Sequence, residues 1–396
     1  MRYDFDQQIN RMNTDCAKWD GLEGRFGVKD AIPMWVADMD FMSPQPVIDQ
    51  LKKRVEHGIF GYTFRSDSYT EAIVDWLQRR HHTTIEKDWL CHSPGVVTAL
   101  NTIVRQFTEP GDKIIIQPPV YYPFKMSIEQ HGREVVNNPL KFAEGYYTID
   151  FEDLEAKAAL GAKLLILCSP HNPIGRVWSR AELEQLGHIC QKYNILVVAD
   201  EIHNDLIYKD YVHTPFLSIS EEFAQHSITC IAASKTFNLA GLQTSTVIIP
   251  NAQLRERYLQ TLQTTGFIGG NIFGFLATES AYRDGDEWLD QVLDYLKANL
   301  AFLTAYFAEH IPQIKVIQPE GTYLVWLDCR ELGLDPQSLQ EFAIKQARIA
   351  FDEGFIFGTE GEGFNRINIA CPRALLEQAC KNIEQAVKDH INSQVA

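Results

Sequence analysis

The stretch AKLLILCSPHNPIGRVWSRAELEQLGHICQKYNILVVADE, residues 162–201, contains the pattern that decides the fold. Two short apolar runs, LLILC and ILVVA, flank a segment of helical periodicity at 179–193. Ser179, with Glu182 three residues later, forms a capping-box pattern at the start of that segment. Its apolar stripe consists of Leu183, Leu186 and Ile189 or Cys190. A strand, a helix and a strand at this spacing predict a crossover unit with parallel strands.

Similar apolar runs recur between residues 90 and 250 and indicate further buried strands of a mostly parallel sheet. They are DKIIIQPP (112–119), ITCIAAS (228–234) and TSTVIIP (244–250). After residue 280 the pattern changes to a long amphipathic helix at 288–310, short strands and a last helix. We therefore expect an N-terminal arm with part of a small domain at 1–45, a large domain at 46–283 and a smaller α+β domain at 284–396.

The composition excludes several classes of protein. The net charge of the 396 residues is −16, which argues against nucleic acid and anionic membranes as main partners. No apolar stretch approaches the ~20 residues that cross a bilayer. The eight cysteines are scattered and form no C-x-x-C pair, so we expect reduced thiols, no metal site and a cytoplasmic location. The pair His81 and His82 lacks ligands at zinc spacing and is predicted to lie on the surface.

Polar side chains follow several of the predicted strands, at the edge of an open α/β sheet where ligands bind. They are Tyr121 and Tyr122, Asn172, Asp200 with His203, and Lys235, and Gly95 opens a helix after another short strand. Each has a plain structural alternative. Asp200 is also compatible with a helix cap, Asn172 with a turn and Lys235 with a solvated surface position.

Taken together, these residues are the set that pyridoxal 5′-phosphate requires. A lysine amine forms a Schiff base with its aldehyde, and an aspartate pairs with its protonated pyridine nitrogen. An aromatic ring stacks on the pyridine, an amide binds the ring oxygen, and a helix N-terminus binds the phosphate. The sequence therefore predicts pyridoxal phosphate as the cofactor.

Motifs along nearly the whole chain resemble those of fold type I pyridoxal-phosphate enzymes, the aspartate aminotransferase superfamily. They include KWD (18–20), WVADMDF (35–41), GIFGYT (58–63), CSPHNPIGRVW (168–178), SKTFNLAGL (234–242), FDEGFIFG (351–358) and GFNRINIACP (363–372). More narrowly, the chain resembles the MalY/PatB group of cystathionine β-lyases and cystalysin-like C–S lyases. The resemblance implies an α/β fold, with a mostly parallel seven-stranded sheet in a large domain and a smaller α+β domain.

The resemblance also implies a role for each site residue. Lys235 is the Schiff-base lysine, Asp200 the partner of the pyridine nitrogen and Asn172 the donor to the ring oxygen. The remaining roles are stacking by Tyr121, help to the leaving group from Tyr121 or Tyr122, phosphate binding by Gly95, Val96, Val97 and Ser234, cofactor contact by His203, and α-carboxylate binding by Arg366. Tyr62 is expected to reach the phosphate from the other subunit of a homodimer with a shared active site.

Three positions depart from the aminotransferase pattern: His203 stands where many members carry Tyr, Gln243 where many carry a phosphate-binding Arg, and Ala232 where many carry Ser. These departures favour a lyase. We expect α,β-elimination of L-cystathionine and related cysteine S-conjugates, cysteine and cystine included, to pyruvate, ammonia and a thiol. The alternatives are an aminotransferase on the same scaffold and a regulatory protein that binds the cofactor.

Overall fold

A seven-stranded sheet forms the centre of the computed structural model, which describes residues 2–267 and 269–395. The strand order is β2-β10-β9-β8-β7-β3-β4. The bounds are β2 Leu90–Ser93, β10 Ser245–Ile248, β9 Ser227–Ile231, β8 Leu196–Asp200, β7 Leu164–Cys168, β3 Lys113–Ile116 and β4 Glu134–Asn137. Strand β10 pairs antiparallel with both neighbours, and the other adjacent pairs are parallel. This confirms the mostly parallel seven-stranded sheet.

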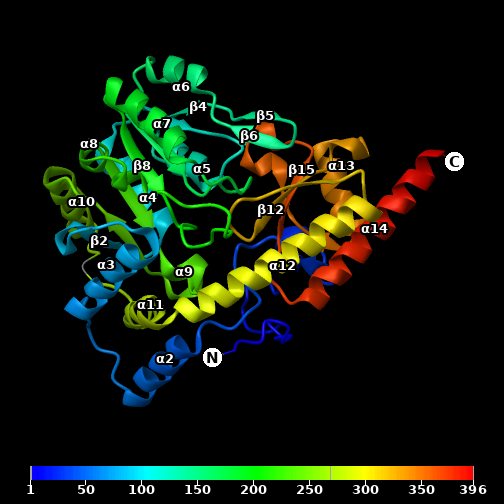
Figure 1. Cartoon of the computed structure of the whole chain (residues 1–396), viewed down its shortest axis with the longest axis horizontal. Coiled ribbons are helices and arrows are strands. Elements are labelled where there is room, and N and C mark those ends of the chain that lie inside the picture. The colour runs from blue at the N-terminus through cyan, green and yellow to red at the C-terminus, as the bar shows by residue number, and fades with distance from the viewer. Residues whose placement is uncertain (1, 268, 396) are drawn as a thin grey trace.

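Helices cover both faces of this sheet because successive strand residues point to opposite sides (Figure 1). Leu165 and Val197 pack in the cluster that contains buried residues of α6 and α7, whereas Ile166 and Val198 pack in the cluster of α4, α5 and α10. The helix bounds are α1 Leu22–Phe26, α2 Gln45–His57, α3 Asp67–His81, α4 Val96–Phe107, α5 Pro123–Glu129, α6 Phe151–Ala158, α7 Arg180–Lys192, α8 Glu221–Gln225, α9 Ala233–Thr236, α10 Ala252–Thr264 and α11 Ile272–Asp284.

The crossover unit predicted from residues 162–201 is confirmed. Strands β7 and β8 pair in parallel, and α7 connects them. Ser179 and Glu182 form the expected capping box, in which each side chain accepts from the backbone N–H of the other residue. The strands end in register, so that Cys168, Asp200 and Cys230 lie side by side at one edge of the sheet.

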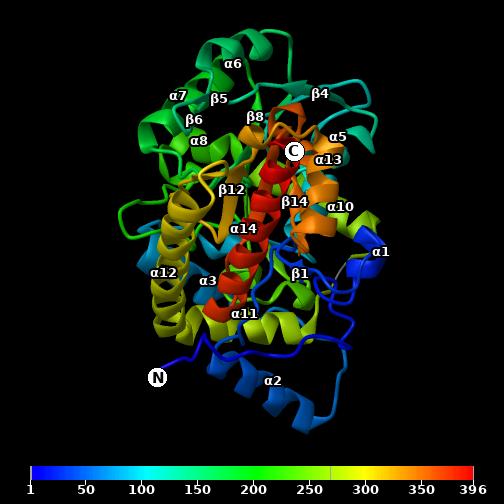
Figure 2. The ribbon, with the colours of Figure 1, turned by 90° about the vertical axis from the view of Figure 1, so that its right-hand side faces the viewer.

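A second, antiparallel sheet of order β11-β12-β15-β14 lies beside the first, flanked by two long helices (Figures 1 and 2). Its elements are β11 Lys315–Ile317, β12 Leu324–Asp328, β14 Asp352–Glu353, β15 Phe364–Asn368, α12 Asp286–His310, α13 Pro336–Glu341 and α14 Arg373–Val395; the hairpin β5 Lys141–Ala143 and β6 Tyr146–Thr148 pairs separately. Near the N-terminus β1 (Ile32–Pro33) pairs with β13 (Ile349–Ala350), so the arm joins the C-terminal part. The three-part division at residues 45 and 283 stays a prediction.

Other expectations have mixed outcomes. All eight cysteines are free thiols, and seven of them are buried. The surface position predicted for the pair His81 and His82 is confirmed for His82, which is exposed. It is wrong for His81, whose side chain is only 5% exposed, with Nε2 2.7 Å from the buried Asp205 Oδ1. Long-range packing of α3 against the loop after β8 causes this burial, and histidine spacing carries no sign of it. Within the described residues, no helix is both long and apolar enough to span a bilayer.

Replacing Ser179 with Ala should lower the free energy of unfolding by about 1 kcal/mol, because it removes the side-chain acceptor at the start of α7. Urea unfolding followed by circular dichroism measures the change. Ser179→Asp retains an acceptor and serves as the matched control. Equal losses in the two variants would contradict the assigned cap.

Candidate active site

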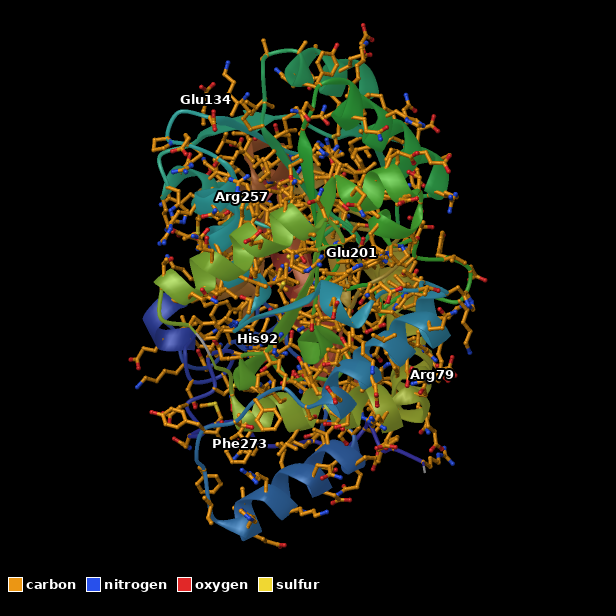
Figure 3. The ribbon with its side chains drawn as sticks, turned by 90° about the vertical axis from the view of Figure 1, so that its left-hand side faces the viewer. Arg79, His92, Glu134, Glu201, Arg257 and Phe273 are labelled. Carbon is orange, nitrogen blue, oxygen red and sulfur yellow. The ribbon has the colours of Figure 1, made fainter. Side chains whose placement is uncertain are left out.

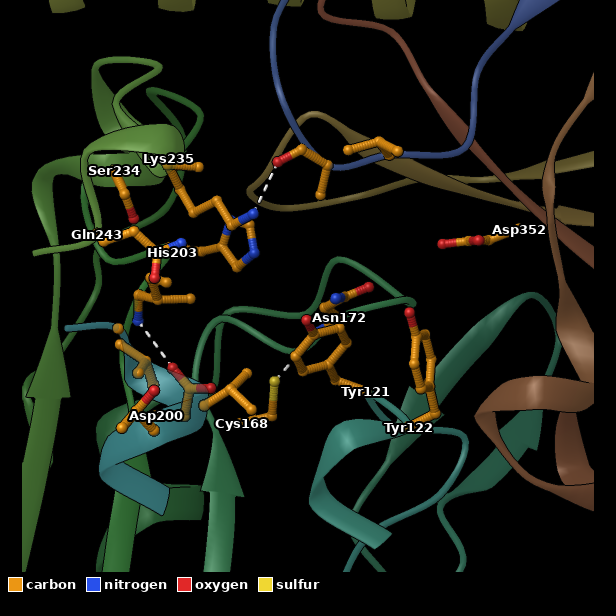
Figure 4. Close-up of a pocket in the computed structure, with 18 of the residues that line it drawn as sticks. Tyr121, Tyr122, Cys168, Asn172, Asp200, His203, Ser234, Lys235, Gln243 and Asp352 are labelled. Atoms are coloured by element: carbon orange, nitrogen blue, oxygen red, sulfur yellow. Dashed lines mark hydrogen bonds between the residues drawn. The ribbon is translucent and has the colours of Figure 1, made fainter. Parts of the chain in front are cut away.

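A cavity of about 330 Å³ opens where the carboxyl ends of β7, β8 and β9 face the small sheet and the segment 35–37 (Figure 4). Most of the predicted site residues line it: Gly95, Val96, Val97, Tyr121, Tyr122, Asn172, Asp200, His203, Ser234, Lys235 and Arg366. Tyr62 does not; its side chain is fully exposed. The cavity thus gathers residues that are up to about 330 positions apart in the chain.

Lys235 sits on the single helical turn α9, directly after β9. Its Nζ donates to the Ala37 carbonyl oxygen at 2.7 Å, and the Tyr323 hydroxyl donates to the same oxygen at 3.0 Å. Burial lowers the pKa of the amine from 10.5 to about 8, and the positive charge of Arg366 acts in the same direction. The uncharged fraction of this amine near neutral pH is therefore larger than that of an ordinary lysine, which favours its use as a nucleophile or a base.

Asp200 ends β8 and is 4% exposed. Burial raises the pKa of its carboxyl from 3.8 to about 7, although Lys235 opposes the rise. Its Oδ1 accepts the Ile202 amide at 3.1 Å, and no ion pair engages it within the described residues. A carboxyl buried without a counter-charge favours a cation placed beside it in the cavity.

Arg366 lies on β15, directly across from Asp352 on β14. The guanidinium is buried: Nη1 donates to Asn172 Oδ1 at 3.0 Å, and Nη2 donates to the Trp35 carbonyl at 2.7 Å and to Asp352. Its Nε is buried without a partner. Because a buried N–H costs free energy when unpaired, this group is prepared to bind an acceptor that enters the cavity.

The N-terminus of α4 provides backbone donors at another wall of the cavity. Gly95 is its N-cap and brings no side-chain acceptor, and the first intrahelical bond runs from the Ala99 N–H to the Gly95 oxygen at 3.0 Å. The N–H groups of Val96 and Val97 lie in the first turn, where the backbone N–H groups of every helix lack an intrahelical acceptor. With Ser234 on the same cavity, they suit a phosphate dianion.

His203 and the two tyrosines complete the wall. Burial lowers the pKa of His203 well below 6.5, so its ring is neutral, and its buried Nδ1 has no partner. Burial raises the pKa values of Tyr121 and Tyr122, so both hydroxyls keep their protons near neutral pH. The rings of the two tyrosines are 5.4 Å apart. The donors, the buried acid and the amine together fit pyridoxal phosphate.

Sequence reasoning missed two parts of the cavity: the segment Trp35, Val36 and Ala37, and the acid Asp352. The segment acts through backbone carbonyls, which leave no signature in residue types. Asp352 reaches the site through strand register, although the motif FDEGFIFG contains it. Of the three departures from the aminotransferase pattern, His203 and Gln243 line the cavity, and Ala232 is the N-cap of α9.

The fold and the cavity define an enzyme of the fold type I pyridoxal-phosphate class. The chain belongs to the aminotransferase class I and II family, whose model matches residues 29–383. It is 44% identical to cystathionine beta-lyase PatB of Bacillus subtilis, over 97% of this chain and 99% of that one. It is 34% identical to protein MalY of Escherichia coli, over 98% and 99%. The pyridoxal-phosphate-containing structure of cystalysin from Treponema denticola matches with a TM-score of 0.96 at 40% identity, over 98% and 100%.

The lowered pKa of Lys235 predicts how the cofactor-free protein reacts with an amine-directed reagent. Labelling of Lys235 should rise with pH and reach half its limiting rate near pH 8, because only the uncharged amine reacts. Peptide mass spectrometry measures the rate at each pH. A midpoint at about 10.4, the usual value for a lysine side chain, would contradict the assigned environment.

Proposed function

We propose that this protein is a pyridoxal-phosphate-dependent carbon–sulfur β-lyase. It cleaves L-cystathionine and related cysteine S-conjugates to pyruvate, ammonia and a thiol. The observation that carries this proposal is a lysine amine of lowered pKa in the same cavity as the buried Arg366. Identity of 44% to a cystathionine beta-lyase over nearly the full length supports the choice of sulfur substrates.

Each wall of the cavity has a part in holding the cofactor. When bound, pyridoxal phosphate provides the electron sink that makes the substrate α-proton removable and lets the Cβ–S bond break. Asp200 keeps the ring nitrogen protonated, and Asn172 binds the ring oxygen. Tyr121 stacks on the ring, while Ser234 and the first amides of α4 bind the phosphate.

Arg366, Lys235 and the two tyrosines act on the substrate itself. Arg366 binds the α-carboxylate, and its contact with Asn172 fixes the plane of the guanidinium. Lys235 accepts the proton from the substrate Cα, which its lowered pKa suits. Tyr121 and Tyr122 both keep their hydroxyl protons, so either can protonate the departing sulfur.

We infer that the enzyme is a homodimer with a shared active site. The segment after α2 exposes four large apolar side chains, which a monomer seldom tolerates in one patch. They are Ile59, Phe60, Tyr62 and Phe64. The ring centroids of Phe60 and of Phe273 on α11 are 5.6 Å apart. Figure 3 shows Phe273 above α2. The proposed partner for this patch is a second copy, whose cavity receives Tyr62.

The free thiols support a cytoplasmic location.

Incubation of the purified enzyme with L-cystathionine should release pyruvate, ammonia and thiol in equal amounts. Lys235→Ala should lower this rate on the order of a thousandfold, because the base is lost. Coupled assays for pyruvate and free thiol give both quantities. The exchange Lys29→Ala, at an exposed lysine, is the control. Transfer of the amino group to the cofactor without free thiol would instead establish an aminotransferase.

Mixed dimers test whether the active site is shared. Lys235→Ala and Tyr62→Ala homodimers should each be weakly active, and subunit exchange between them should restore about a quarter of wild-type activity. Restoration arises because one site of each mixed dimer receives both intact residues. If Tyr62 served its own chain, both sites of the mixed dimer would carry a lesion and no activity would return.

A further inference from the structure

Asp352 occupies the same wall of the cavity as Arg366. The antiparallel register of β14 and β15 places the two residues opposite each other, and their side chains form a buried ion pair. The carboxylate is 5% exposed and lines the cavity. Figure 4 shows it facing the cavity across from Lys235, with Tyr122 on the same side.

Two arginines compensate the negative charge of Asp352, and one of them also contacts a second acid. Oδ2 accepts from Arg366 Nη2, and Oδ1 lies 3.3 Å from Arg25 Nη2. That Arg25 nitrogen is also 2.9 Å from Glu353, so its charge is shared between two acids. A carboxylate can accept about four hydrogen bonds, and these two contacts leave room for another donor.

Substrate binding disturbs this balance. In the free protein Arg366 pairs with Asp352. When a substrate binds, its α-carboxylate also pairs with Arg366 and compensates part of the arginine charge. Asp352 then keeps only a shared arginine as counter-charge, in a buried setting where an uncompensated charge is unfavourable. A cation on the substrate restores the balance, whereas a second anion makes it worse.

We propose that Asp352 selects cysteine S-conjugates whose tail carries an amino group and disfavours those whose tail ends in a carboxylate alone. This inference rests on the proposed function and names the substrate class of the same site. L-Cystathionine and L-cystine both carry a distal ammonium. Aspartate and glutamate, whose tails are anionic, are disfavoured by the same carboxylate.

The competing explanation is that Asp352 only orients Arg366. That role affects every substrate equally, because all of them present an α-carboxylate to Arg366. A role in selection acts on the ratio of kcat/KM between tails of different charge. The ratio therefore separates the two roles even if Asp352→Asn lowers all rates.

Three probes of similar size provide the test: S-(2-aminoethyl)-L-cysteine, S-propyl-L-cysteine and S-carboxymethyl-L-cysteine. In the wild-type holoenzyme, kcat/KM for pyruvate release should fall in that order and span about tenfold or more, as expected for a charged hydrogen bond. Asp352→Asn should compress the span to about twofold. Asp328→Asn is the matched control: Asp328 lies on β12 of the same sheet, pairs with Arg330 and does not line the cavity, so the wild-type order and span should persist.

The outcomes are distinct. An equal fall for all three probes in Asp352→Asn, or no charge preference in the wild type, would overturn the selection role. Asp352→Glu keeps the charge and should retain part of the span, which covers the case in which Asp352→Asn does not fold. Absence of pyruvate from every probe with the wild-type enzyme would contradict the proposed function itself.

Discussion

The constraint on which the site depends is that an amine and a carboxyl must stay enclosed without forming an ion pair to each other. In water Lys235 and Asp200 would both be charged, and their altered pKa values exist only because the cavity removes solvent. The edge of a sheet alone is too open for this purpose. The segment 35–37 and the small sheet supply the missing walls, so enclosure requires chain segments from both ends of the sequence.

The segment after β1 is held by charges that lie outside the cavity. Lys18 is fully buried, with Nζ 2.6 Å from Asp40, and Arg11 contacts both Asp38 and Asp40. Burial works against the charge on Asp40, but Lys18, Trp19 and Arg11 together outweigh it and hold the pKa of that carboxyl below 3.8. Removing one partner of such a network costs about 3–5 kcal/mol. The network explains how a stretch without regular structure keeps the Ala37 carbonyl in place for Lys235.

The sequence predicts features formed by residues that are close along the chain better than features formed by distant segments. The crossover unit at 162–201 and its cap follow from periodicity and from residues three positions apart, and both were predictable. The cluster at the strand ends was predictable because parallel strands bring their carboxyl ends to one edge. The Ala37 carbonyl, the ion pair of Asp352 and the burial of His81 depend on register and packing between distant segments, which residue types do not encode. The role of Tyr62 follows neither from residue patterns nor from the structure of one chain, since its proposed site lies on another copy of the chain.

The most direct test of the central claim is to find which amine holds the cofactor. Reduction of the holoenzyme with borohydride fixes the cofactor to that amine irreversibly, and peptide mass spectrometry locates it. The enclosed amine of Lys235, with its lowered pKa, predicts that the peptide spanning SKTFNLAGL carries the added mass. Attachment at another lysine, or no attachment, would contradict the account of how this cavity works.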